Sequence, residues 1–412
     1  MPVEYPEIKV GLDDFVESLK DVLDDEINKP IFNFEVTPTE ACNCCCSYCF
    51  EPTQLLQPTP ARITRNSIKI IQALLDNHEF QAAFKGVNLT FWGGEPTLNV
   101  QNVMSYINAF GAKTNVYWHI YTNGTRQEEL ERIVTQFEKY RAVNRLSVQI
   151  SYDGNPVHDL RRCFKGSDEP TSSYALATAR RLVARGVRVS FKATITPPDF
   201  HLLPRAWDSY RDLCLEFNAQ RKPNDYIQYC PTIDQAHDYD QDFSEDFKAA
   251  LAEVCAKELE FFKKNKYYVM SWFGSFAHQC SRGRSMVCMN TVGTLYTCHG
   301  VQYFLGDGKR SNLQDELVTS TLGIEPEQVV ESILKKSASD DHNKYRKLPD
   351  ECVNCIATHC ALCNACSASL SEADSPEERW YDRSVQKHLC KYYKIFGAYD
   401  KALDCYQAGI RL

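Results

Sequence analysis

The sequence predicts an α/β protein built on a parallel β-sheet, and three observations lead to this prediction. Short runs rich in β-branched and aromatic residues recur between residues 31 and 230. Segments with helical periodicity separate these runs, and both patterns stop near residue 272. Strands that alternate with helices pair in parallel through right-handed crossovers. The first two thirds of the chain are therefore expected to form either an open α/β sheet or a partial barrel.

Six strands are expected in this part of the chain. They are IFNFEV (31–36), VNLTFW (87–92), VYWHIY (116–121), LSVQIS (146–151), VRVSFKATI (187–195) and YIQYC (226–230). In open sheets and barrels of this kind the chemistry lies at the carboxyl ends of the strands. The residues that follow each strand are therefore the first candidates for a functional site.

Helices are expected near residues 12–26, 63–78, 126–140, 173–186 and 245–264. Beyond the last of these, the sequence is rich in cysteine: nine of the 19 cysteines fall between Cys280 and Cys390. The economical division is an N-terminal helical segment (1–30), an α/β domain (31–270), a cysteine-rich domain (271–392) with little regular structure, and a C-terminal helix (393–412).

Charge and hydropathy exclude several classes of protein. The formal net charge of -8 argues against nucleic-acid binding, which normally needs a basic patch. The N-terminus has no basic and apolar signal segment, and no run of 18 apolar residues occurs. We therefore expect a soluble cytoplasmic protein without membrane contacts. Because the cytoplasm keeps thiols reduced, clustered cysteines there indicate a metal site rather than disulfides.

The densest group of cysteines is ACNCCCSYCF (41–50), directly after the first expected strand. Two ligand spacings fit it, Cys42-x3-Cys46-x2-Cys49 and the mirror arrangement Cys42-x2-Cys45-x3-Cys49. A loop with three thiolates suits a 4Fe-4S cluster with one iron left open, whereas a structural zinc site would need four ligands. Spacing alone leaves both arrangements open.

With Tyr48 before the last thiol and Phe50 after it, Cys42-x3-Cys46-x2-Cys49 resembles the signature of the radical S-adenosylmethionine (SAM) superfamily. The resemblance implies a partial (βα)6 TIM-type barrel whose three thiolates hold a 4Fe-4S cluster, with SAM bound to the fourth iron. Reductive cleavage of SAM then gives a 5′-deoxyadenosyl radical that abstracts a hydrogen atom. Cys44 and Cys45 have no ligand role in this arrangement.

Two further stretches match the same superfamily at the ends of expected strands. Gly93, Gly94 and Glu95 begin a GGEP turn, which on its own would be an ordinary turn but in the superfamily contacts the amino group of SAM. ISYDGNPVHDLRR resembles a run in which Ser151 and Arg162 would contact the carboxylate and ribose end of SAM. Arg161 is an adjacent alternative to Arg162.

The C-terminal cysteines resemble the SPASM domain found in one branch of the superfamily, which holds two auxiliary 4Fe-4S clusters. In order, the resemblance implies Cys280, Cys288, Cys298 and Cys363 for the first cluster and Cys352, Cys355, Cys360 and Cys390 for the second, with Cys366 as an alternative to Cys363. On spacing alone, zinc fits this region as well as iron-sulfur. The isolated cysteines, among them Cys163, are expected to be packing residues.

Members of this branch mostly modify peptides or proteins, so the resemblance implies a maturase that forms a thioether or carbon-carbon cross-link in a ribosomally made precursor peptide. His299 follows Cys298 where sulfatase-maturing relatives carry an aspartate base, and it is the candidate proton acceptor. An electron donor such as flavodoxin or ferredoxin is implied. A separate leader-binding protein is a further possible partner, because only about 30 residues precede the first strand.

Three alternatives stay open: an anaerobic sulfatase-maturing, formylglycine-generating enzyme; a small-molecule SPASM oxidoreductase; and a non-catalytic zinc-binding protein. The first two differ in substrate, and the last predicts no SAM cleavage.

Overall fold

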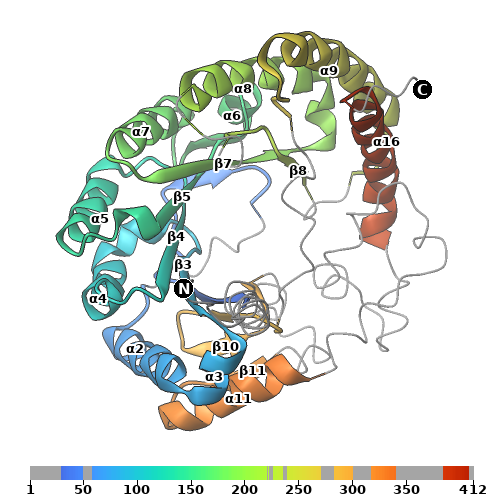
Figure 1. Cartoon of the computed structure of the whole chain (residues 1–412). Coiled ribbons are helices and arrows are strands. Elements are labelled where there is room, and N and C mark those ends of the chain that lie inside the picture. The colour runs from blue at the N-terminus through green and yellow to red at the C-terminus, as the bar shows by residue number, and fades with distance from the viewer. Residues whose placement is uncertain are drawn as a thin grey trace, which may run out of the picture.

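The computed structural model describes residues 29–49, 58–219, 221, 226–234, 239–270, 283–299, 317–339 and 384–407. A curved β-sheet forms the inner layer, and helices cover its outer side as an arc (Figure 1). This is the α/β architecture with a mostly parallel sheet that the alternating pattern predicts, in the form of a partial barrel. The expected N-terminal helix near residues 12–26 lies outside the described residues.

Six strands of the sheet run parallel in the order β1-β3-β4-β5-β7-β8. Their bounds are Ile31–Val36 (β1), Gly86–Phe91 (β3), Val116–Thr122 (β4), Leu146–Ser151 (β5), Arg188–Ile195 (β7) and Pro231–Ile233 (β8). The first five confirm the predicted strands to within one residue at each end.

The sixth strand was misplaced by the sequence pattern, which predicts it at 226–230. In the structure the amide and carbonyl of Ile227 bond to the side chain of Asn218, at 2.7 and 2.9 Å. Tyr229 stacks on Tyr210 with ring centroids 4.2 Å apart. Because a side chain from the preceding helix satisfies this backbone, pairing with β7 begins only at Pro231.

The helices on the outer side follow the strands they connect. The described helices are α2 (Ala61–Asp76), α3 (His78–Ala83), α4 (Val100–Phe110), α5 (Gln127–Lys139), α6 (Val157–Arg161), α7 (Ser172–Ala184), α8 (Leu203–Asn218), α9 (Ser244–Asn265), α11 (Pro326–Ala338) and α16 (Ser384–Gln407), with 3-10 turns η1 (Pro96–Asn99), η2 (Val143–Arg145) and η3 (Pro197–Leu202). Four of them, α2, α5, α7 and α9, confirm predicted helices. The last, α16, begins nine residues before the helix expected at 393–412.

The two faces of the sheet differ in character because successive strand residues point to opposite sides. The face toward the helices is apolar and fully buried, with Phe34, Leu89 and Trp118 at 0 to 1% exposure. The inner, concave face carries polar and aromatic side chains, including Asn33, Glu35, Asn88, Thr90, His119, Tyr121, Ser147, Gln149 and Ser151. The apolar face holds the fold together, and the concave face carries the polar groups that could bind a ligand.

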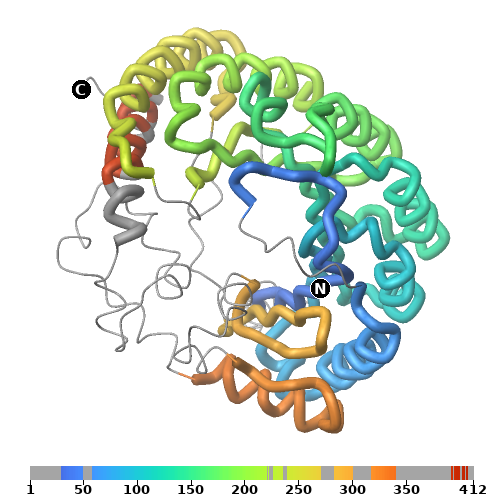
Figure 2. Tube along the Cα trace, turned by 180° about the vertical axis from the view of Figure 1, so that it is seen from behind, coloured from blue at the N-terminus to red at the C-terminus, as the bar shows by residue number. Residues whose placement is uncertain are grey.

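The sheet continues beyond residue 270, where the sequence predicts a domain boundary. Strand β9 (Met286–Met289) pairs in parallel with β1. β10 (Thr294–Tyr296) and β11 (Leu317–Ser320) extend the sheet as antiparallel strands. Figures 1 and 2 show these strands beside β1, with α11 next to α2. The first part of the predicted cysteine-rich domain thus shares hydrogen bonds with the barrel sheet.

A second, two-stranded sheet lies at the carboxyl ends of the barrel strands. Strand β2 (Cys44–Cys46) pairs antiparallel with β6 (Arg162–Phe164). The segment after β1, blue in Figure 2, crosses the strand ends to reach this position. Within the ranges described above, no helix is long and apolar enough to cross a membrane.

Candidate active site at the strand ends

The cysteine loop that follows β1 is fixed by backbone hydrogen bonds. Asn43 O accepts from Lys165 N at 2.9 Å, and Ser47 N donates to Arg161 O at 3.0 Å. Cys49 N donates to Cys46 O at 3.0 Å, which closes a tight turn. The segment around β6 therefore holds the loop along its length and brings Cys46 and Cys49 close together.

The five thiols of this loop have different environments. In β2, alternation places Cys44 and Cys46 on one side and Cys45 on the other. Cys45 is exposed and pairs across the strands with Cys163, which is only half-buried and so is not the packing residue that its isolation suggests. A hydrogen bond from the Cys44 thiol lowers the pKa of Cys42, and the same bond raises the pKa of Cys44.

The GGEP turn after β3 packs directly on the base of the cysteine loop. Gly94 N donates to Thr39 O at 3.2 Å, and Glu95 N donates to Ala41 O at 2.8 Å. A Cβ on Gly94 would lie 2.2 Å from Ala41 O, and one on Gly93, where φ is +126°, would lie 2.7 Å from Thr39 O. Both glycines are required by this contact between strand ends.

The Glu95 carboxylate joins the ends of β3 and β4. It accepts hydrogen bonds from Thr97 N and Oγ1 (3.1 and 2.6 Å), Thr122 Oγ1 (2.9 Å) and Asn123 N (2.7 Å). Glu95 is fully buried, and burial raises its pKa. Its carboxylate is thus occupied within the protein, so any contact of the GGEP turn with a cofactor would come from the backbone.

Asn123 is a site residue that the sequence pattern did not reveal. Its Nδ2 lies 2.9 Å from Asn43 Oδ1 and 3.9 Å from Cys42 Sγ. It follows β4 in YTNGT, where Asn-Gly is an ordinary signal for a turn. Only its position at a strand end could have marked it as a candidate.

Arg162 and Asp153 form a buried ion pair beside the cysteine loop. Arg162 donates to Asp153 through Nε (2.8 Å) and Nη2 (3.2 Å), and its Nη1 lies 3.6 Å from Cys46 Sγ. The Tyr48 hydroxyl also donates to Asp153, and Thr194 N does so at 2.8 Å. Burial opposes ionisation of Asp153, but the charge of Arg162 outweighs it and holds the pKa of Asp153 below its usual value.

The polar neighbours of this pair have structural partners of their own. The alternative arginine, Arg161, forms a two-point ion pair with Asp199 at 2.6 and 2.7 Å. His158 is fully buried between Asp153 N and Thr171, and burial lowers its pKa to about 4. Arg162 is therefore the arginine that faces the loop.

Ser151 is the last residue of β5, and it lies half-buried on the concave side opposite Lys192 of β7. The structure thus places it at a strand end, as the sequence predicts.

A second group of residues gathers on the concave face at β1, β3 and β9. His299 Nδ1 lies 2.7 Å from the buried carboxylate of Glu35. The Trp92 ring packs on His299 with centroids 4.3 Å apart, and its Nε1 donates to Cys288 Sγ at 3.3 Å. Burial raises the pKa of Cys288, and the nearby Cys298 adds to this. Two of the predicted auxiliary cysteines are therefore close enough for their charges to interact.

The remaining predicted ligands cannot be placed. Outside the described residues lie Cys280, Cys352, Cys355, Cys360, Cys363 and Cys366, and Cys390 lies in α16 without a described side chain. Among the described residues, no three His, Cys, Asp or Glu side chains are gathered tightly enough for a single metal ion. A 4Fe-4S cluster is larger than a single ion, and its thiolates bind different iron atoms and therefore stand farther apart.

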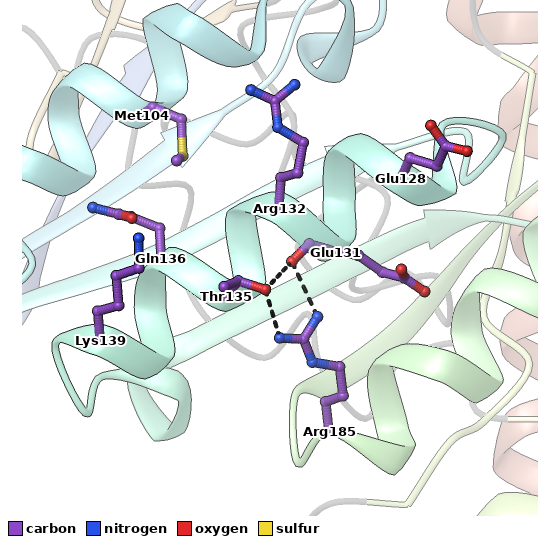
Figure 3. A pocket seen from close by; sticks show the side chains of 8 residues that line it. All are labelled: Met104, Glu128, Glu131, Arg132, Thr135, Gln136, Lys139 and Arg185. Carbon is purple, nitrogen blue, oxygen red and sulfur yellow. Dashed lines mark hydrogen bonds between the residues drawn. The ribbon is translucent and has the colours of Figure 1, made fainter.

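A groove of about 540 Å³ lies on the outer, helical side of the sheet. Its lining residues are Met104, Glu128, Glu131, Arg132, Thr135, Gln136, Lys139 and Arg185. Figure 3 shows Arg185 turned toward Thr135 and the backbone carbonyl of Glu131, to which it donates at 2.9 and 3.0 Å. These residues come from α4, α5 and the end of α7, so the groove is no part of the site at the strand ends.

Comparison with known proteins identifies the domain. Residues 36–199 match the model of the radical SAM superfamily. The chain carries a radical SAM domain. This confirms the superfamily predicted from the cysteine spacing and the GGEP turn. No curated protein matches the chain.

Two solved structures extend the similarity of fold beyond residue 199. Native anSMEcpe with bound AdoMet has a TM-score of 0.60 at 14% identity, over 89% of this chain and 99% of that one. SuiB from Streptococcus suis, bound to S-adenosylmethionine, has a TM-score of 0.51 at 13% identity, over 92% of this chain and 81% of that one. At such identities the likeness concerns the fold alone.

Proposed function

We propose that this protein is a radical SAM/SPASM peptide maturase that oxidatively cross-links a ribosomally made precursor peptide. The observation that carries the proposal is the interlocking of the cysteine loop with the GGEP turn. Backbone bonds from Gly94 and Glu95 to the loop, and the Arg162 contact to Cys46, bring the separate superfamily motifs to one place.

The residues of the loop fit a three-thiolate cluster site. Cys46 and Cys49 flank a tight turn, and Cys42 stands in the same loop. Burial raises the pKa of Cys46 to about 11, so its thiolate would form as iron binds and displaces the proton. The exposed Cys45 faces away from Cys46 across β2, which supports Cys42, Cys46 and Cys49 over the mirror arrangement. With cluster and SAM bound, the cofactors supply a 5′-deoxyadenosyl radical that abstracts hydrogen.

The chain's own residues would orient SAM at this site. The turn of Gly93 and Gly94 presents backbone without a Cβ, which permits close approach of a ligand. Ser151 stands on the concave side at the end of β5, where the resemblance expects the carboxylate and ribose. Glu95 acts indirectly, since it fixes the turn to β4.

Two auxiliary 4Fe-4S clusters belong to the same proposal. The first would use Cys280, Cys288, Cys298 and Cys363, and the second Cys352, Cys355, Cys360 and Cys390, with Cys366 as the alternative to Cys363. The proximity of Cys288 and Cys298 on the concave face supports the first set. An acceptor at that position could take the second electron of a net oxidation.

His299 is the proposed proton acceptor. A carboxylate accepts hydrogen bonds, so Glu35 holds the proton on Nδ1, and in that tautomer Nε2 is the nitrogen that can accept a proton. The His299 side chain is 33% exposed whereas that of Glu35 is 2% exposed, so only the imidazole can meet a substrate. Trp92 fixes the ring plane by packing on it.

A peptide substrate suits the polar concave face of the sheet. His119, whose burial lowers its pKa to about 4, is neutral and bonds to Ser147 at 2.6 Å, and Tyr121 lies against it. Structures of anSMEcpe include bound Cp18Cys peptide, and SuiB is known with the precursor peptide SuiA. An electron donor such as flavodoxin or ferredoxin, a separate leader-binding protein and a cytoplasmic location complete the proposal.

Anaerobic reconstitution tests the cofactor part of the proposal. We expect about twelve iron and twelve sulfide per chain, as three 4Fe-4S clusters require, and 5′-deoxyadenosine after addition of dithionite and SAM. A colourless protein that binds zinc and leaves SAM intact would show the zinc-binding alternative to be correct.

Coexpression with a peptide encoded beside this chain tests the substrate part. Mass spectrometry should show the loss of two hydrogens for each cross-link, and fragmentation should locate the linked residues. Turnover of a small molecule with no peptide present would instead favour a small-molecule oxidoreductase.

Sulfatase maturation is the second candidate, because anSMEcpe has the higher TM-score of the two neighbours, 0.60 against 0.51. His299 in place of the aspartate that sulfatase-maturing relatives carry weighs against it. Incubation with a sulfatase peptide containing Cys or Ser distinguishes the two, since only this candidate predicts formylglycine.

A further inference from the structure

Arg162 connects the buried Asp153 to a cysteine of the loop. All three of its guanidinium nitrogens have contacts: Nε and Nη2 with Asp153 at 2.8 and 3.2 Å, and Nη1 with Cys46 Sγ at 3.6 Å. The residue is 8% exposed and Asp153 is fully buried. The positive charge beside the sulfur is therefore poorly screened by water.

The guanidinium is held firmly in this position. Asp153 also accepts from the Tyr48 hydroxyl and from Thr194 N, so the carboxylate itself is anchored to the loop and to β7. The Tyr48 ring lies under the guanidinium at 5.0 Å from its centroid. The backbone of Arg162 pairs with that of Cys46 across β2 and β6. Together these contacts hold the Arg162 side chain beside Cys46 Sγ.

Hydrogen bonds to cluster sulfurs and nearby positive charge both favour the reduced state of an iron-sulfur cluster, because reduction adds negative charge. We propose that Arg162, positioned by Asp153, donates to the Cys46 thiolate and raises the reduction potential of the cluster held by the cysteine loop. The inference rests on the proposed function insofar as Cys46 is a cluster ligand. It gives Arg162 a role that exists before SAM binds.

The superfamily resemblance assigns Arg162 a different task, contact with the carboxylate end of SAM. The two tasks make different predictions for protein without SAM. A residue that only binds SAM leaves the potential of the SAM-free cluster unchanged, whereas a donor to Cys46 changes it. The potential measured without SAM therefore separates them.

The experiment is a potentiometric titration, followed by electron paramagnetic resonance, of the full-length reconstituted protein without SAM. The relevant cluster is the one whose spectrum changes when SAM is then added. In Arg162→Gln its midpoint potential should shift to more negative values. The matched control is Arg161→Gln, which removes an adjacent arginine with its own ion pair to Asp199 and no contact with sulfur, and should leave the potential unchanged.

An unchanged potential in Arg162→Gln, or an equal shift in Arg161→Gln, would overturn the inference. If Arg162→Gln does not fold, Arg162→Lys serves instead, because its ammonium keeps the charge but loses the two-point hold of Asp153. Arg162→Lys should shift the midpoint potential in the same direction but by a smaller amount, and an unchanged potential would again contradict the inference. If no cluster in the wild-type protein responds to SAM, the proposed function itself is wrong.

Discussion

The two described groups of cysteines are assembled in different ways. Cys42, Cys46 and Cys49 lie within one loop, and backbone bonds to neighbouring strand ends shape it. Cys288 and Cys298 reach the concave face because β9 pairs with β1, far from it in sequence. The groups that donate hydrogen bonds to the sulfur atoms also differ. Cys46 Sγ accepts from the charged guanidinium of Arg162, and Cys288 Sγ accepts from the neutral indole of Trp92.

This difference indicates that the loop holds its thiolates in one arrangement beside the charged side chain of Arg162, which Asp153 fixes in place. The second group depends on the register of the sheet and on an aromatic residue that also contacts His299. Changes in the loop should therefore act on SAM cleavage, and changes in the second group on later steps with the peptide.

The largest effect is expected from the loop cysteines. Cys42→Ala, Cys46→Ala or Cys49→Ala should abolish 5′-deoxyadenosine formation, since each removes a thiolate of the proposed cluster. Cys45→Ala is the matched control and should largely retain it, because Cys45 faces away from Cys46. Loss of cleavage in Cys45→Ala with retention in Cys46→Ala would show that the mirror arrangement is correct.

Asp153→Asn should have the second largest effect. It leaves Arg162 buried without its carboxylate, so the free energy of unfolding should fall by about 3–5 kcal/mol in urea titrations. The exposed pair Arg180–Glu216 provides the control: Glu216→Gln should cost about 0–1 kcal/mol. An equal loss in both variants would contradict the importance of burial.

The same variant has a defined dependence on pH. The folded-state pKa of Asp153 lies below its unfolded value, so its contribution is present above the unfolded value and is lost as the pH falls through the folded value. The difference in stability between wild type and Asp153→Asn should thus be constant near neutral pH and shrink in strong acid.

Gly94→Ala should break the contact between turn and loop. The new Cβ would lie 2.2 Å from Ala41 O, and overpacking of this kind costs about 1–3 kcal/mol. Calorimetric titration should show weakened SAM binding. Gly166→Ala is the control for an added methyl group, because nothing lies within 4 Å of its Cβ; its φ of +80° adds backbone strain, so it should cost stability but leave SAM binding unchanged. Unchanged SAM affinity in Gly94→Ala would contradict the role of the turn.

The smallest effect is expected from Trp92→Phe. The ring that packs on His299 is largely kept, but the hydrogen bond to Cys288 Sγ is lost, which is worth about 1 kcal/mol. SAM cleavage should be unaffected while peptide oxidation, followed by mass spectrometry, slows several-fold. If SAM cleavage fell instead, the two cysteine groups would not be functionally separate.

Local patterns were sufficient for most of the barrel. Alternation of buried and half-buried residues in β4 and β5 is a property of the strand itself, so their bounds could be predicted. The GGEP turn could also be recognised locally, because its four residues are consecutive and directly follow an expected strand. The strand at 231–233 could not, because the competing partner of residue 227 is Asn218, a side chain on a helix.

The sequence by itself determined where most of the parallel strands and their helices lie, the cysteine loop, and the superfamily. Each of these depends on residues that are close together in the chain. The tertiary structure alone decided which groups face the thiols. Glu35 and His299 are 264 positions apart, and Trp92 and Cys288 are 196 apart. Such contacts follow from strand pairing and side-chain direction, and no spacing in the chain encodes them. The same holds for Arg162: it contacts Cys46 Sγ, whereas the adjacent Arg161 pairs with Asp199, and only the folded chain separates the two.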